Sequence, residues 1–416
     1  MTNTLVVEMD EELAESVAMS ASTQDHVPVG EAIVFSGFRW NANNTPERVA
    51  LVLGQAGWRV LYCSNTSSFL HEGSGKRSKL SESVEGLEPW IVGQRLNLLP
   101  VVDGWQAKLL VAQVLRNARE LGFQRPVVMY PHGIWFAAVA REFKKRNLPC
   151  VFLCMDHTGK REWEALASEA DLVFAVPPSM YQLLKAEFRD KVRLIPQIGP
   201  GLNTEHTSGA ESEASARWEK IPRPRLAYVG APNDRLNPAL FAQVLAEHPE
   251  WHFLTCGQMT NVSRPNLHNI GWVGPQEIAA ICRAIDVGFM PYDCRIDFNL
   301  HCVPLKLFDY FGAGLPVAST PILCLQEYKD LVYLGETAEE LAQGIRNALA
   351  EASDDPRREE RRRIARAHSP QEMAKLLPAV LIAAFGKSHG LGGKRDAATD
   401  GRAAAAEESW ADRRRR

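Results

Sequence analysis

The residues between positions 303 and 319 are those best suited to chemistry. Their pattern predicts a loop, a short helix, a glycine stop at Gly314 and a buried strand. Lys306 falls in the first helical turn, where free amides and the helix dipole favour an anion, so it suits a diphosphate. Asp309, one turn further on the same face, could accept from a ribose hydroxyl. An amphipathic helix with an exposed lysine and a glycine cap fits the same spacing.

Apolar segments that alternate with helical patterns must position this site. In the first half, strands are expected at residues 32–36, 59–63, 126–130, 150–154 and 172–176. In the second half, they are expected at residues 225–230, 252–257, 269–273, 287–291, 315–319 and 331–334. Fully apolar strands separated by helices indicate parallel sheets covered on both faces. We therefore predict an α/β chain of two Rossmann-like, doubly wound domains that face a central cleft, with ligands at the carboxyl ends of the strands.

Composition shifts suggest where these domains begin and end. Both ends of the chain have little apolar surface to bury and are expected to be disordered, although the four arginines at the C-terminus could instead touch anionic lipid. The predicted segments are a tail at 1–28, a first domain at 29–200, a linker at 201–221, a second domain at 222–350, closing helices at 351–387 and a tail at 388–416.

The overall composition is that of a globular protein with two domains. The chain has 416 residues, and its formal net charge of -3 argues against a nucleic-acid partner. Its 8 cysteines form no C-x-x-C pair, which argues against zinc and favours buried thiols in a reducing cytoplasm. No apolar run reaches the roughly 18 residues that span a bilayer, and the N-terminus lacks a signal-peptide layout. A cytoplasmic location is expected.

The segment Lys306-Leu-Phe-Asp-Tyr-Phe-Gly-Ala-Gly-Leu-Pro-Val resembles the nucleotide-binding motif K-L-x-E-Y-x-A-x-G-x-P-V of GT-B glycosyltransferases. Shorter likenesses follow the family's order at 170–179, 198–203 and 227–231, so that the resemblance covers residues 30–385. Within the superfamily it is strongest to bacterial exopolysaccharide glucuronosyltransferases and teichuronic-acid-type transferases. The resemblance implies transfer of a sugar from a nucleotide-sugar, of the UDP type, to a hydroxyl of a glycan or lipid-linked acceptor, without a cofactor.

The same resemblance suggests further donor-binding residues. It places Tyr292 near the donor diphosphate and Val273 beside the nucleotide base, which it would contact through backbone groups. Gly230 ends the first strand of the second domain and permits close approach of a phosphate. Packing or turn chemistry could account for each of these residues equally well.

The stereochemical prediction rests on a departure from the family pattern. Many retaining members carry two glutamates separated by seven residues, and here those positions hold His301 and Asp309. The missing first carboxylate favours an inverting mechanism, which needs a general base. Asp156 follows an apolar strand and aligns with the catalytic aspartate of the exopolysaccharide glucuronosyltransferases, although it could instead cap the next helix. His132 is a weaker candidate base.

Residues that contact the acceptor or the transferred sugar are predicted less specifically. Arg39 and Trp40 follow the first strand, in a loop where such contacts are expected, but a solvated arginine fits equally well. His132 and His301 are further candidates for this role. No Asp-x-Asp motif occurs, so we predict a reaction without a metal ion, in which Lys306, Tyr292 and the helix dipole neutralise the leaving diphosphate.

Two questions stay open at the level of sequence. Residues 90–115 combine leucines and tryptophans with Arg95 and Lys108, which suits either an interfacial helix on the inner membrane or a helix packed on the first sheet. The activity has two alternatives: a nucleotide-sugar epimerase of the same architecture, and a catalytically degenerate scaffold in a glycan-assembly complex.

Overall fold

The computed structural model describes residues 28–40, 44–64, 75–89, 100–200, 218, 220–230, 235–256, 262–271 and 273–389. Most of both predicted tails, most of the predicted linker, Trp272 and positions 90–99 of the predicted amphipathic segment lie outside these residues.

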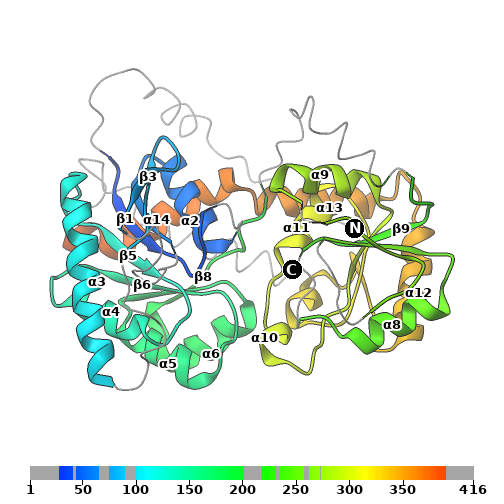
Figure 1. Ribbon diagram of the computed structural model, residues 1–416, viewed down its shortest axis with the longest axis horizontal. Coiled ribbons are helices and arrows are strands. Elements are labelled where there is room, and N and C mark those ends of the chain that lie inside the picture. Colours follow the sequence, from blue (N-terminus) through cyan, green and yellow to red (C-terminus); the bar gives the residue numbers. More distant parts are fainter. Residues whose placement is uncertain are drawn as a thin grey trace, which may run out of the picture.

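The first sheet has its strands in the order β3-β4-β2-β1-β5-β6-β7-β8. Its neighbouring strands pair in parallel, except for the antiparallel pair β3 and β4. The bounds are β1 Glu31–Phe35, β2 Arg59–Cys63, β3 Arg77–Lys79, β4 Val84–Leu87, β5 Val127–Tyr130, β6 Cys150–Cys154, β7 Leu172–Ala175 and β8 Val192–Leu194. This sheet forms the core of the blue-to-green domain in Figure 1.

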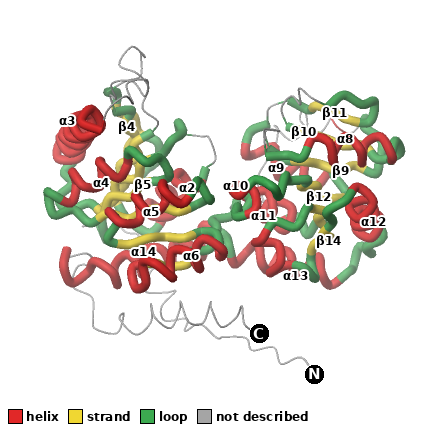
Figure 2. Tube along the Cα trace, turned by 90° about the horizontal axis from the view of Figure 1, so that it is seen from below, coloured by secondary structure: helices red, strands yellow, loops and turns green. Residues whose placement is uncertain are grey.

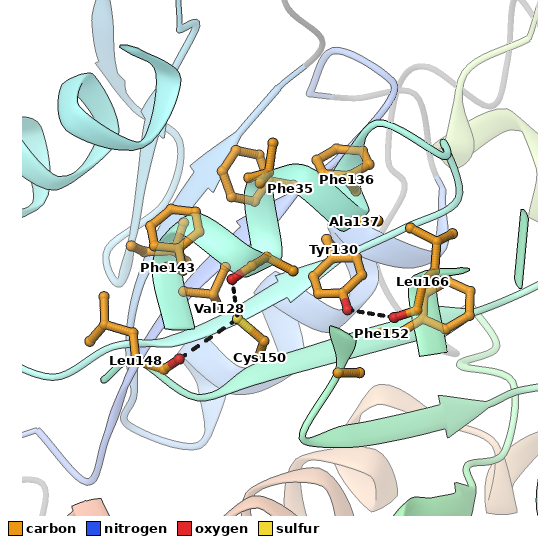
Figure 3. Packing of buried hydrophobic residues seen from close by; sticks show 14 of the residues in the cluster. Phe35, Val128, Tyr130, Phe136, Ala137, Phe143, Leu148, Cys150, Phe152 and Leu166 are labelled. Atoms are coloured by element: carbon orange, nitrogen blue, oxygen red, sulfur yellow. Dashed lines mark hydrogen bonds between the residues drawn. The ribbon is translucent and has the colours of Figure 1, made fainter. Parts of the chain in front are cut away.

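Helices cover both faces of the first sheet, because alternate residues of each strand point to opposite sides. Ile33 and Phe35 pack with α3, α4 and α5, whereas Ala32 and Val34 pack with α2 and α14. Figure 3 shows the first of these layers, where the rings of Phe35, Phe136 and Tyr130 meet. The bounds are α2 Thr45–Gln55, α3 Pro100–Glu120, α4 Phe136–Lys144, α5 Lys160–Glu169, α6 Pro178–Phe188 and the 3-10 turn η2 Arg189–Lys191.

The second sheet is parallel throughout, in the order β11-β10-β9-β12-β13-β14. Its strands are β9 Arg225–Tyr228, β10 His252–Thr255, β11 Leu267–Asn269, β12 Val287–Met290, β13 Val317–Ser319 and β14 Val332–Leu334. The accompanying helices are α8 Pro238–Glu247, α9 Pro275–Ala284, α10 Asp297–Leu300, α11 Leu305–Gly312, η3 Leu323–Tyr328, α12 Ala338–Leu349, α13 Pro356–Ala367 and α14 Pro370–His389. Helices α8 and α12 cover one face, and α9, α11 and α13 cover the other.

The last helix returns to the first domain, where Figure 2 also places it. The apolar side of α14 joins the cluster formed by β1, β2 and α2, through Met373, Leu377, Val380, Leu381 and Phe385. The two chain crossings between the domains are hydrogen-bonded to each other. The amide of Gly199 donates to the His368 carbonyl at 2.7 Å, and His368 Nδ1 lies 2.7 Å from the Gln197 carbonyl.

The structure confirms the prediction of two doubly wound domains. The expected strand at residues 269–273 is wrong, because the strand ends at Asn269 and Gly271 adopts a φ of 78°. The polar β3 and the short β4 and β8 were not predicted, because none of them carries a continuous apolar run. Within the described part of the chain, no helix is long and apolar enough to cross a membrane.

The strand order reverses between β1 and β5 in the first sheet and between β9 and β12 in the second. In open parallel sheets such reversals open crevices at the carboxyl ends of the strands, where ligands bind. His132 follows β5, and Gly230 and Tyr292 follow β9 and β12. The fold therefore places these three predicted site residues at the two positions best suited to ligand binding.

Candidate functional site

Helix α11 is fixed to the second sheet by one tyrosine. The hydroxyl of Tyr310 donates to the Ala227 carbonyl and accepts from the Val229 amide, both at 2.8 Å. The ring lies where a side chain at position 288 would stand: a Cβ added to Gly288 would be 2.5 Å from it. These contacts fix α11 against the sheet. Lys306, one turn before Tyr310, lies on the same side of the helix, and Asp309 lies on the adjoining side.

Lys306 lies among aromatic groups at the end of β9. Its ammonium donates to the Tyr292 hydroxyl at 3.0 Å and stands 4.1 Å from the centre of the Tyr228 ring. Burial, followed by the neighbouring Tyr228, raises the pKa of Tyr292 well above its usual value, so this phenol stays neutral.

The Lys306 side chain packs against Gly230, which has no side chain to exclude it. The residue has a φ of 137°, and an added Cβ would lie 3.2 Å from Lys306 Cε and 3.3 Å from Nζ. The sequence predicted a close approach at Gly230, and the close neighbour in the structure is the lysine side chain.

Asp309 is half-buried on α11, with charges from both domains near its carboxyl. Burial raises the pKa of its carboxyl to about 6, against the opposing charges of Arg48 and Lys306. Arg48 comes from α2 of the first domain, is itself buried, and donates to the Ile198 carbonyl at 2.7 Å. Sequence reasoning missed Arg48; the available signal was a charged residue within the apolar run of a helix. The predicted ribose contact of Asp309 stays a prediction.

Asp156 follows β6 and faces the same interface from the first domain. It does not cap the next helix, because α5 begins after Gly159. Burial raises the pKa of its carboxyl, while the charge of Arg235 opposes that rise. The alternative interpretation of Asp156 as a helix cap is therefore wrong, and a raised pKa is typical of a general base.

His132 supports Asp156 rather than competing with it. Its Nε2 accepts from the amides of Met155 and Asp156, at 3.0 and 3.1 Å. Its Nδ1 is hydrogen-bonded to the Thr158 hydroxyl at 3.1 Å. Because both ring nitrogens have partners, this geometry leaves no lone pair with which His132 could act as a base.

Arg235 joins the two halves of the site. It precedes α8 of the second domain, and its guanidinium lies 3.8 Å from a carboxylate oxygen of Asp156 in the first domain. Sequence reasoning missed this residue, although it follows β9 at the same sheet edge as Gly230. The contact brings Asp156 beside a residue from the sheet that also carries the predicted donor-binding residues.

His301 forms a second contact between the domains. Its Nδ1 lies 2.8 Å from the Ser179 hydroxyl of α6, and its ring stacks on His157 at 4.9 Å. Burial, followed by the charge of His157, lowers the pKa of His301, which favours the neutral ring. The residue in place of the family's glutamate is thus an uncharged interface residue beside the base candidate.

The remaining predicted residues are less clearly engaged. Arg39 is exposed, and Trp40 packs edge-on against Tyr62 at 5.0 Å. Val273 is half-buried just before α9 and packs on the core of the second domain. None of the groups of acidic, histidine and cysteine side chains in the described ranges is arranged to hold a metal ion.

Comparisons with known proteins agree with this geometry. No family model matches the chain. A putative teichuronic acid biosynthesis glycosyltransferase, TuaH of Bacillus subtilis (strain 168), is 29% identical over 154 residues, which is 34% of this chain and 38% of that protein. The match thus spans well under half of the curated relative.

Solved structures show the fold. Anabaena Alr3699/HepE in complex with UDP-glucose superposes with a TM-score of 0.62 at 12% identity, over 84% of this chain and 99% of that one. A putative UDP-N-acetylglucosamine 2-epimerase from Listeria monocytogenes gives 0.52 at 10% identity, over 86% and 97%. The chain has the GT-B fold, as the sequence motif predicted.

The packing of Gly230 against Lys306 can be tested by Gly230→Ala. An L-residue at that φ is strained and must also displace the lysine, so we expect destabilisation of about 1–3 kcal/mol in urea unfolding. Gly37→Ala is the matched control, because an added Cβ there meets nothing within 4 Å. Equal stability of the two variants would contradict the contact.

Proposed function

We propose that the chain is an inverting glycosyltransferase of polysaccharide biosynthesis. It transfers a sugar from a UDP-sugar to a hydroxyl of a glycan or lipid-linked acceptor. The observation that carries the proposal is the contact of Asp156 in the first domain with Arg235 in the second, which also holds Lys306 between two tyrosines. Burial raises the pKa of the Cys302 thiol to about 12, and the charges of Asp156, Arg235 and Lys306 all act on this one group.

The second domain supplies the donor site. Lys306, supported by Tyr292 and given room by Gly230, binds the diphosphate at the N-terminus of α11. Asp309 contacts the ribose, and backbone groups at Val273 contact the base. The Anabaena protein, which shares this fold, was solved with UDP-glucose, with UDP and glucose, and with UDP. That likeness supports a uridine nucleotide as the donor.

The first domain supplies the base. Asp156 takes the proton of the acceptor hydroxyl as its oxygen bonds to the anomeric carbon, and the bond from that carbon to the diphosphate oxygen breaks. The electron pair leaves on the diphosphate, whose charge Lys306 stabilises. His301 carries no carboxylate that could form a covalent intermediate, which supports a single displacement with inversion.

A transfer assay with a panel of UDP-sugars and acceptors tests this function. We expect product only when an acceptor is present, with inverted anomeric configuration by NMR. Asp156→Asn should lower kcat by about 100-fold to 10,000-fold, because the base is lost without a change of shape. Asp190→Asn, at an exposed site of the same domain, should leave kcat unchanged.

Other outcomes of that assay identify the alternatives. Conversion of the UDP-sugar without an acceptor would indicate an epimerase, with which the chain shares its fold. Full activity of Asp156→Asn would show that the base is another residue. A folded chain that turns over none of the donors would favour the scaffold.

We further propose that transfer needs no divalent metal, since Lys306 and the dipole of α11 face the diphosphate. Full activity in a chelating buffer is expected. Activity that disappears in chelator and returns with magnesium would overturn this proposal.

Contact with the inner face of the membrane is also proposed, through an apolar surface of the first domain. Trp105 and Leu109 on α3 are 57% and 46% exposed, with Lys108 exposed between them. Because α3 leads into the start of β5, its first half lies near the carboxyl ends of the strands. Phe38 and Ile134, which are 60% and 46% exposed, follow β1 and β5 at that edge. Aromatic, aliphatic and basic groups together suit an anionic lipid surface.

Flotation with vesicles that contain phosphatidylglycerol tests this contact. The double variant Trp105→Ser/Leu109→Ser should bind at least about tenfold more weakly, because two large apolar side chains no longer enter the lipid. Leu323→Ser removes a similarly exposed leucine from the second domain and should bind normally. Failure of the parent chain to float, or an equal loss in both variants, would contradict the proposal.

A further inference from the structure

Contacts within the second domain hold Arg235 in position. Its guanidinium stacks over the ring of Phe298 at 4.1 Å. Its carbonyl accepts from the Asp293 amide and from the Asn299 side chain, both at 2.9 Å. The side chain is 28% exposed. The backbone and the guanidinium are therefore both oriented before any substrate enters.

Asp156, whose carboxylate lies beside Arg235, is also held in place by its neighbours. His132 holds the amide of Asp156, and the side chain of Asp156 is only 23% exposed. A fixed carboxylate and a fixed guanidinium, 3.8 Å apart, thus approach each other from different domains.

Two charged groups act on the carboxylate of Asp156: Arg235 first and His132 second, both opposing the rise of its pKa by burial. His132 accepts from the two amides through Nε2, and its Nδ1 lies 3.7 Å from a carboxylate oxygen of Glu162. Burial raises the pKa values of the Cys154 and Cys302 thiols, so both stay protonated. Lys306 acts on Cys302 together with Asp156 and Arg235, and His157, the neighbour of Asp156 in the chain, stacks on His301. Of the two charges that oppose the rise of the Asp156 pKa, Arg235 is the larger, and it comes from the second domain.

We propose that Arg235 is a positioning residue for Asp156: the second domain keeps the base of the first domain ionised and oriented towards the interface. The inference rests on the proposed function, because it assigns a role within that reaction.

The pH dependence of kcat/KM tests the proposal, with Arg235→Ala, Arg235→Lys and the control Arg295→Ala. Arg235 lowers the pKa of Asp156, so its removal raises that pKa, and the acid limb of the profile moves to higher pH. At the acid end, Arg235→Ala should lose about tenfold more kcat/KM than at pH 8. Arg235→Lys should recover part of that loss, because the charge remains.

Arg295 is a matched control, because it lies near the same loop but is 80% exposed and pairs with Asp293. Its alanine variant should keep the parental profile. A uniform loss at every pH in Arg235→Ala, or an equal shift in Arg295→Ala, would overturn the proposal.

A readout without turnover separates this inference from the proposed function. In protein with ¹³C-labelled aspartate carboxyls, the resonance of Asp156 is the one that disappears in Asp156→Asn. It should titrate at higher pH in Arg235→Ala than in the parent chain. An unchanged titration overturns the role of Arg235 even if sugar transfer is confirmed. A shifted titration supports the electrostatic link even if the chain transfers no sugar.

Discussion

The two hydrogen bonds of the Tyr310 hydroxyl, to Ala227 and Val229, set the geometry of the donor side. Each contributes on the order of 1 kcal/mol, but their position matters more than their strength. They hold α11 against the end of β9. Because Gly288 has no side chain, the Tyr310 ring can pack closely on the backbone of the sheet there. The first turn of α11 then brings Lys306 beside Gly230, Tyr228 and Tyr292. If the Tyr310 ring packed elsewhere, α11 would shift and Lys306 would move away from the end of β9.

A second set of contacts fixes how the two domains are placed relative to each other. The chain crosses between them twice, and Gln197, Gly199 and His368 bind these crossings together. Gln197 also donates to the Val303 carbonyl just before α11, and its side-chain oxygen accepts from Thr45 at the start of α2. This junction fixes the separation at which Arg235 meets Asp156. In the proposed mechanism, nucleotide binding and proton transfer thus depend on contacts that lie outside the reacting groups.

The sequence was sufficient for the fold, whereas the roles of the predicted site residues stay predictions. Buried strands such as β1 and β6 are continuous apolar runs, and the Lys306 motif combines a helix start with a charge. The polar edge strand β3 carries no such signal. Contacts across the interface were beyond reach, because the partners of Asp156, Asp309 and His301 come from other parts of the chain. For Asp156, the sequence could not exclude a helix cap; the structure does, because α5 starts at Lys160 with Gly159 as its N-cap, and the role of base stays a prediction.

The central claim is a division of labour, with the nucleotide bound by the second domain and the proton taken by the first. Calorimetric titration of UDP tests it most directly, with the parent chain, Lys306→Ala and Asp156→Asn. The account predicts that Lys306→Ala binds UDP at least tenfold more weakly, because a charge-assisted contact with the diphosphate is lost. Asp156→Asn should bind as the parent chain does. Absence of UDP binding in the parent chain, or equal weakening in both variants, would contradict the account.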